Sequence, residues 1–142
     1  MNWVMDHVAR VVPDLEGYLK RSHLPAPGPI VYDPLQDADI CFIDLGGDQP
    51  RLELIHPKSP SSKVYKAAQE HPNALHHVCY RVADVAPAQA LVRELRMVPV
   101  YGPVPAVAFG GAMVLFAYTR NRELLELVCG AQLQVTPSMG AP

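Results

Sequence analysis

The sequence HVARVV at residues 7–12 returns seventy residues later as HVCYRV at residues 77–82. A second pair of segments, LELI at residues 52–55 and LELV at residues 125–128, recurs at an offset of 73 residues. Repetition at a nearly fixed period is typical of a duplicated structural unit. Because both offsets are close to half of the 142 residues, the sequence predicts two equivalent modules of about seventy residues.

The local pattern in each half predicts the order β-α-β-β-β. The two hexapeptides are short and rich in β-branched residues, as strands are, and each is followed by an acidic or proline-marked helix start. Helical spacing of apolar residues predicts a short first helix at Leu15–Leu19 and a clearer second helix at Ala88–Leu95. Apolar runs predict the other strands at residues 40–43, 51–55, 98–100, 112–118 and 123–128. The proline-rich segment Leu24–Asp37 is interpreted as a connection.

The chain length fits one compact domain. Within it, the repeat places the first βαβββ module at residues 1–58 and the second at residues 75–130. The polar segment 59–74 is interpreted as a linker with about one helical turn, and residues 131–142 as a loose tail.

Composition and charge exclude several classes of protein. The 15 prolines are about twice the usual share, which favours many short elements over a bundle of long helices. Twelve basic and 14 acidic residues give a net charge of −2 without a basic run, so the electrostatic pattern of a nucleic-acid binder is missing. No apolar stretch approaches the roughly 20 residues of a membrane span. Three widely spaced cysteines match neither a disulfide framework nor a zinc ribbon, which predicts a cytoplasmic protein.

Alternation along the strands places four polar side chains on the face opposite the helices. Val8 and Val12 are expected to pack on a helix, which directs the neighbouring His7 to the other face, and the same parity applies in each repeated segment. The four residues are His7, Glu53, His77 and Glu126. A buried carboxylate without a cation costs several kcal/mol, on the order of the penalty for a desolvated ion. Because two imidazoles and two carboxylates suit a divalent ion, the sequence predicts a metal site.

Five segments occur in an order that resembles the vicinal-oxygen-chelate superfamily, which includes glyoxalases, bleomycin-resistance proteins and dioxygenases. The similarity is greatest to the methylmalonyl-CoA epimerase-like branch. The segments are DHV at 6–8, LELIHP at 52–57, LHHVCY at 75–80, GG at 110–111 and LELV at 125–128.

The resemblance implies an α+β fold in which two βαβββ modules form a concave mixed β-sheet cavity with helices outside. It further implies one divalent metal ion, whether cobalt, nickel, manganese, magnesium, zinc or iron, held by the first and fourth strands of each module. Those positions are His7, Glu53, His77 and Glu126. The epimerases commonly carry Gln where Glu53 stands, whereas bacterial-type glyoxalase I enzymes have the same His, Glu, His, Glu set. Proteins of this family are usually homodimers.

We therefore expect a metal-dependent isomerase, epimerase or lyase that removes a proton α to a carbonyl of a small metabolite or acyl thioester. Glu126 or Glu53 is the expected base, and the metal stabilises the enolate. An epimerase needs a second acid, for which the sequence offers Asp33, Asp37 or neither. Arg81 is interpreted as a rim or structural charge rather than an anion ligand.

Two other function classes remain open at this stage. One is a non-catalytic small-molecule binding or resistance protein of the same fold. The other is an Fe(II) oxygenase, against which the extra Glu argues, because such iron sites normally use two His and one carboxylate.

Overall fold

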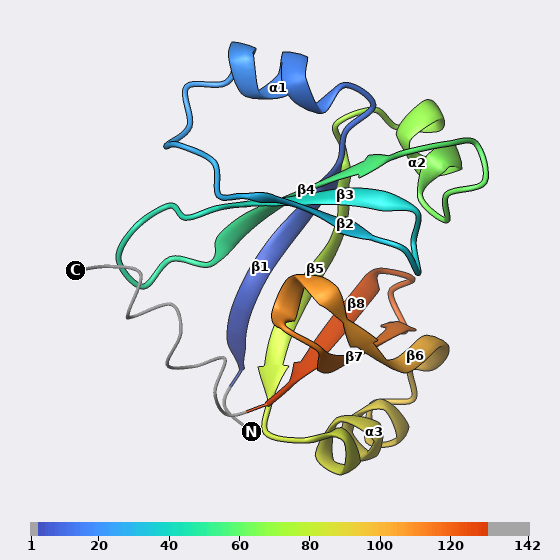
Figure 1. Ribbon diagram of the computed structural model, residues 1–142. Helices are drawn as coiled ribbons and strands as arrows, with labels where there is room; N and C mark the ends of the chain where they lie inside the picture. The colour runs from blue at the N-terminus through green and yellow to red at the C-terminus, as the bar shows by residue number, and fades with distance from the viewer. Residues whose placement is uncertain (1–2, 131–142) are drawn as a thin grey trace. The chain divides into compact units, whose positions relative to one another are not determined.

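The computed structural model describes residues 3–130 of the chain, and the predicted loose tail at residues 131–142 lies outside this range. The described residues divide into two compact units. Residues 7–76 form the unit that we call the first module, and residues 3–6 together with 77–130 form the second module. The boundary falls inside the strands Val4–Val11 and Leu75–Val82, which are described with the first and the second module, respectively. Figure 1 shows the ribbon of the chain.

The first module contains a mixed four-stranded sheet with the strand order β2-β3-β4-β1. Strand β1 pairs in parallel with β4, whereas β3 pairs antiparallel with both β2 and β4. Helix α1 lies against one face of this sheet (Figure 1). The elements are β1 (Val4–Val11), α1 (Leu15–Arg21), β2 (Ile30–Asp33), β3 (Ala38–Ile43), β4 (Arg51–Pro57) and α2 (Tyr65–Glu70).

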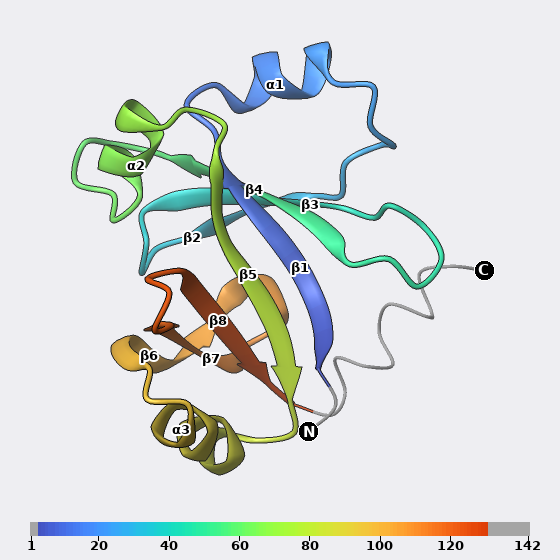
Figure 2. The same ribbon diagram turned by 180° about the vertical axis from the view of Figure 1, so that it is seen from behind.

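The second module repeats this arrangement with the strand order β5-β8-β7-β6. Strand β5 pairs in parallel with β8, and β7 pairs antiparallel with both β8 and β6. Helix α3 packs against β6, β7 and β8, as can be followed from the other side in Figure 2. The elements are β5 (Leu75–Val82), α3 (Val85–Glu94), β6 (Val98–Ala106), the 3₁₀ turn η1 (Val107–Phe109), β7 (Ala112–Tyr118) and β8 (Leu124–Cys129).

The predicted α+β class with two βαβββ modules is confirmed. Most strands differ from the prediction by a few residues at their ends, and two differ more: β2, which was not predicted, and β6, which is longer than predicted. Proline explains both of these differences. Strand β2 spans only four residues between Pro29 and Pro34, which is too short for a recognisable pattern. It therefore lies inside the segment that was interpreted as a connection. Strand β6 continues to Ala106 through three prolines, which an edge strand tolerates because one side of its backbone needs no partner.

Helices α1 and α3 each pack on a cluster of apolar side chains from one face of their sheet. In the first module Leu15 of α1 packs with Ile43 and Leu54. In the second module Leu91 and Val92 of α3 pack with residues of β7 and β8, including Leu115, Leu125 and Leu127. The predicted alternation therefore holds: Leu54 faces α1, and the two leucines that flank Glu126 face α3. Glu53 and Glu126 consequently point to the opposite faces of their sheets.

Helices α1 and α3 both start at an aspartate. The Asp14 carboxylate accepts a hydrogen bond of 3.0 Å from the Gly17 backbone N–H, which satisfies one of the open donors at the start of α1. Asp84 stands at the equivalent position before α3 and accepts from the Val85 N–H at 2.8 Å.

No helix within residues 3–130 combines the length and the apolar character that a membrane span requires.

Gly102 lies in β6 where the pairing with β7 shifts register. Its φ of +85° is left-handed, and a Cβ built there would overlap the backbone oxygen of Val114 in the neighbouring strand. Gly46, in the turn between β3 and β4, has a similar φ of +90° but open space around the Cβ position. A substitution at Gly46 therefore adds backbone strain alone, whereas a substitution at Gly102 adds both strain and a steric clash.

We predict that Gly102→Ala lowers the free energy of unfolding by about 2–4 kcal/mol, because a left-handed conformation and an overlap with backbone both add cost. Gly46→Ala, the matched control, costs only about 1 kcal/mol of conformational strain. Urea denaturation of both variants measures the difference. Equal losses of stability would show that the close approach to Val114 is not a constraint.

Candidate metal centre

In the first module the parallel strands β1 and β4 place a histidine beside a glutamate. His7 Nε2 lies 3.2 Å from Glu53 Oε1. The residues are 0% and 5% exposed, so this pair is screened from bulk water. Because Glu53 stands between Leu52 and Leu54, both of which belong to the helix-side cluster, the strand directs the carboxylate away from α1.

The second module builds the equivalent pair on β5 and β8. His77 Nε2 lies 3.0 Å from Glu126 Oε1, and the two residues are 3% and 4% exposed. Glu126 stands between Leu125 and Leu127, which pack in the cluster beneath α3. The four residues predicted from the sequence are thus organised as one buried His–Glu pair in each module.

A phenylalanine ring packs against the histidine of each pair. Phe42 lies directly across from Glu53 in the β3–β4 ladder, and its ring meets the His7 ring edge to face at a centroid distance of 5.3 Å. Phe116 lies across from Glu126 in the β7–β8 ladder and meets the His77 ring at 5.1 Å. Neither phenylalanine was predicted from the sequence as a residue of the site. Their repeat at an offset of 74 residues, nearly that of the glutamates, is the signal that could have found them.

A buried ion pair supports the strands next to the histidines. Asp6, which precedes His7, is 1% exposed, and its Oδ1 accepts a hydrogen bond of 3.0 Å from Arg81 Nε. The side chain of Arg81 is itself only 15% exposed. The interpretation of Arg81 as a structural charge agrees with this contact.

Asp33 and Asp37, the predicted candidates for a second acid, both accept hydrogen bonds that hold the segment between β2 and β3 in place. Asp33 accepts hydrogen bonds from the Leu35 backbone N–H at 2.9 Å and from Gln36 Nε2 at 2.8 Å. Asp37 accepts from Tyr32 at 2.7 Å and from Ser59 at 2.5 Å, and the Ser59 bond is the main cause that holds the pKa of Asp37 below its usual range. These contacts give both carboxylates a role in fixing the turn.

The three cysteines, all within residues 3–130, are buried and form no disulfide bond. Burial, with a smaller contribution from the charge of Asp84, raises the pKa of the Cys129 thiol to about 11. Burial also raises the pKa of Cys41. Because the thiolate is the reactive form, neither residue is a suitable nucleophile near neutral pH.

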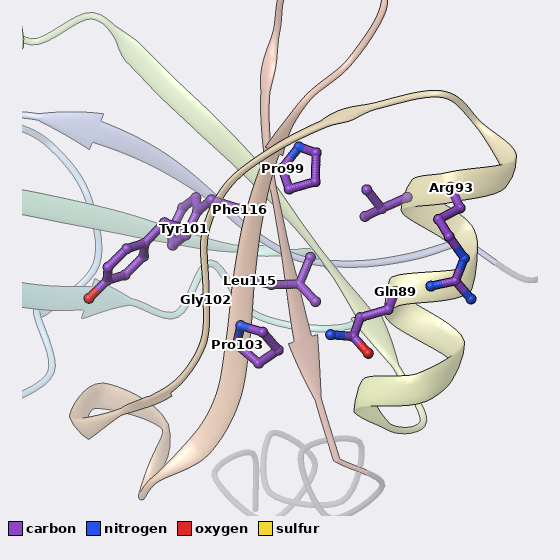
Figure 3. A pocket seen from close by; sticks show the side chains of 9 residues that line it. Gln89, Arg93, Pro99, Tyr101, Gly102, Pro103, Leu115 and Phe116 are labelled. Atoms are coloured by element: carbon purple, nitrogen blue, oxygen red, sulfur yellow. The ribbon is translucent and has the colours of Figure 1, made fainter.

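A cavity of about 240 Å³ lies in the second module between α3 and the strands β6 and β7 (Figure 3). Gln89 and Arg93 provide polar side chains from α3, and the opposite side is apolar. Phe116 contributes to the lining of the cavity, and its ring also contacts the ring of His77. The remaining lining residues are Val92, Pro99, Tyr101, Gly102, Pro103 and Leu115.

Residues 6–116 match the family model described as the Glyoxalase/Bleomycin resistance protein/Dioxygenase superfamily. This match covers most of the chain, including three of the four residues of the two His–Glu pairs. The chain belongs to this superfamily. The predicted family resemblance is thereby confirmed.

Relatives within the superfamily include epimerases of acyl-CoA thioesters. The chain is 29% identical over 121 residues to an ethylmalonyl-CoA/methylmalonyl-CoA epimerase of Cereibacter sphaeroides, across 82% of this chain and 89% of the relative. A methylmalonyl-CoA epimerase structure from Mycobacterium tuberculosis matches with a TM-score of 0.77 and 21% identity, covering 92% and 91% of the two chains. A methylmalonyl-CoA epimerase in complex with methylmalonyl-CoA and NH4+ matches with a TM-score of 0.73 and 21% identity, covering 94% and 98%. These structures show the superfamily fold.

The chemistry of the donors fits a divalent metal. Each His–Glu pair offers one imidazole nitrogen and one carboxylate oxygen at a separation of 3.2 or 3.0 Å, inside a buried environment. Mixed nitrogen and oxygen sets suit borderline divalent ions of the first transition row. A cation bound there also compensates the cost of burying two carboxylates.

We predict that Asp6→Ala lowers the free energy of unfolding by about 2–4 kcal/mol, because it leaves the largely buried Arg81 without its carboxylate. Asp39→Ala is the matched control. Asp39 Oδ2 lies 3.1 Å from Lys58 Nζ, and the side chain of Lys58 is 46% exposed. Ion pairs that solvent reaches contribute about 1 kcal/mol or less. Chemical denaturation of both variants tests the difference, and equal costs would contradict a structural role for the Asp6–Arg81 pair.

Proposed function

We propose that this chain is a metal-dependent isomerase or epimerase that moves a proton α to a carbonyl group, with an acyl thioester as the substrate class. The single observation that carries the proposal is the repeated buried His–Glu pair, one in each module. The kinship with an epimerase of acyl-CoA thioesters supports the same reaction class.

We propose His7, Glu53, His77 and Glu126 as the ligands of one divalent metal ion shared by the two modules. In support, the two pairs have the same strand positions, the same burial and the same donor atoms. When bound, a divalent metal supplies Lewis-acid polarisation of the substrate carbonyl. The proposal leaves the identity of the ion open among cobalt, nickel, manganese, magnesium, zinc and iron.

The residues of the chain then have distinct tasks in proton transfer. The carboxylate of Glu126 or of Glu53 accepts the α-proton from one face of the α-carbon. Epimerisation requires that the replacing proton reach the opposite face, and exchange with solvent then restores the protonation state of the protein. The rings of His7 and His77 hold the carboxylates in position from one side. Phe42 and Phe116, packed on these rings, restrict the imidazoles to one orientation and exclude water from the pairs.

The proposal extends to the outcome of the reaction, the cellular compartment and the oligomeric state. A lyase acting through the same proton removal is compatible with these residues, and the outcome depends on whether the substrate carries a leaving group next to the carbanion. Three buried thiols agree with a reducing, cytoplasmic environment. We propose a homodimer as the functional assembly, in line with the usual state of the superfamily.

We predict that purified protein binds about one Co²⁺ per chain, and that His77→Ala or Glu126→Ala weakens binding at least a hundredfold, because each removes a direct ligand. Glu16→Ala is the control, since Glu16 lies on the surface of α1, with its side chain 80% exposed. Calorimetric titration with Co²⁺ and elemental analysis measure the stoichiometry. Stoichiometric metal in either site variant would eliminate the proposed ligand set.

We predict that the metal-loaded protein catalyses incorporation of solvent deuterium at the α-carbon of methylmalonyl-CoA. Replacing the base, through Glu126→Gln or Glu53→Gln, is expected to slow exchange by about 10²–10⁴-fold, the usual contribution of a positioned general base. Mass spectrometry of the recovered thioester follows the label. Metal-loaded protein that binds thioesters without exchanging any of them would favour a non-catalytic binding protein.

A further inference from the structure

The cavity between α3 and the strands β6 and β7 combines a buried apolar part with an exposed polar part. Val92 of α3 and Leu115 of β7 line it and are each only 5% exposed. Gln89 and Arg93, which also line it, are exposed. Figure 3 shows these two polar side chains on the α3 side of the cavity, with Pro103 on the strand side. A molecule that fits this cavity therefore needs an apolar body and a polar end.

The buried part of the cavity lies on the helix side of the sheet. Leu115 is the register partner of Leu127 in the β7–β8 ladder, and both belong to the cluster that packs beneath α3. Glu126, one residue before Leu127, has the opposite parity and points to the other face. A molecule held against Leu115 is therefore on the face opposite to the carboxylate of the candidate metal centre.

The charge of Arg93 is not compensated by any group of residues 3–130, because no hydrogen bond or ion pair joins its guanidinium to another of these residues. Helix α1 provides a contrast, since Lys20 Nζ in its last turn lies 2.9 Å from the Oε1 of Glu16, four residues earlier. At the same spacing on α3, Arg93 follows Gln89, whose carboxamide is neutral. The edge of the cavity therefore carries a positive charge.

The polar groups at this edge suit a carboxylate. A guanidinium stays protonated at physiological pH, and two of its N–H donors match the two oxygens of a carboxylate. The carboxamide of Gln89 offers further N–H donors one helical turn away.

The size and the walls of the cavity limit the apolar body. An apolar protein cavity of about 150 Å³ binds benzene. The volume of about 240 Å³ therefore accommodates an aromatic ring together with a short chain. Pro99 and Pro103 form part of the wall, and their rings restrict the backbone of β6. A wall that is already fixed loses little conformational entropy when a molecule binds.

We propose that this cavity is a binding site for a small carboxylic acid with a compact apolar body, of the aryl-substituted short-chain type. Arg93 holds the carboxylate at the exposed edge, and the apolar body contacts Val92 and Leu115. The site uses none of the four residues of the proposed metal centre, so it goes beyond the proposed function and does not depend on the proposed reaction.

The test titrates the ¹⁵N-labelled full-length chain with 3-phenylpropanoate, its neutral amide 3-phenylpropanamide, and acetate. NMR signals of the Gln89 side-chain amide and of Arg93 Nε–H report on the cavity directly. The titrations are run with and without diamagnetic Zn²⁺, because a carboxylate is also a metal ligand. The variants are Arg93→Gln, Arg93→Lys and the matched control Arg120→Gln, in which an exposed residue outside the cavity lining undergoes the same change of charge.

The acid is expected to shift both signals with a Kd of about 1 mM or tighter, the range for a ligand of this size. The amide and acetate should each bind about tenfold more weakly, because one lacks the charge and the other lacks the apolar body. Arg93→Gln should weaken binding of the acid about tenfold, as expected for a lost charge-assisted hydrogen bond. Arg93→Lys should lie between this variant and the wild type, and Arg120→Gln should bind as the wild type does.

Three outcomes would overturn the proposal. Equal affinity for the acid and its amide would remove the role of the charge, and unchanged affinity in Arg93→Gln would remove the role of this residue. Shifts that appear only with Zn²⁺, around His77 and Glu126 in place of Gln89 and Arg93, would assign the acid to the metal centre.

Discussion

The burial of a carboxylate next to an imidazole is the constraint on which the rest of each module depends. A glutamate between two leucines on a parallel strand is forced onto the face away from the helix, where water does not reach it. Removing a carboxylate from water costs several kcal/mol, roughly the penalty for one desolvated ion in a protein, so a compensating group is required. The neighbouring parallel strand supplies it, as His7 for Glu53 and His77 for Glu126.

Duplication gives this arrangement twice and then allows each copy to diverge. What is conserved between the modules is the geometry of the pair: the strand positions, the aromatic ring across from the glutamate and the helix on the other face. What differs is the group next to that ring: the guanidinium of Arg51 lies over Phe42 in one module, whereas Leu124 and the tilted ring of Tyr101 lie near Phe116 in the other.

The sequence predicts the pairs well because strand alternation and repetition constrain them together. A single histidine or glutamate in a strand has many explanations, whereas His7, Glu53 and their counterparts recur at matching positions. Phe42 and Phe116 were not predicted, since one aromatic residue in an apolar strand resembles any core residue. Neither was the packing of Arg51 on Phe42, a cross-strand contact that single-strand patterns do not contain. Strand β2 was missed because four residues between prolines carry too little periodicity.

The prolines of β6 have a consequence for the way this protein avoids aggregation. β6 is the outer strand of its sheet, and its exposed valines make it a suitable template for a strand from another molecule. Pro99, Pro103 and Pro105 have no amide hydrogen to offer such a strand, and the register shift of the β6–β7 ladder between Pro99 and Val104 disrupts a flat edge. These prolines therefore protect the exposed edge of the second sheet from pairing with a strand of another molecule.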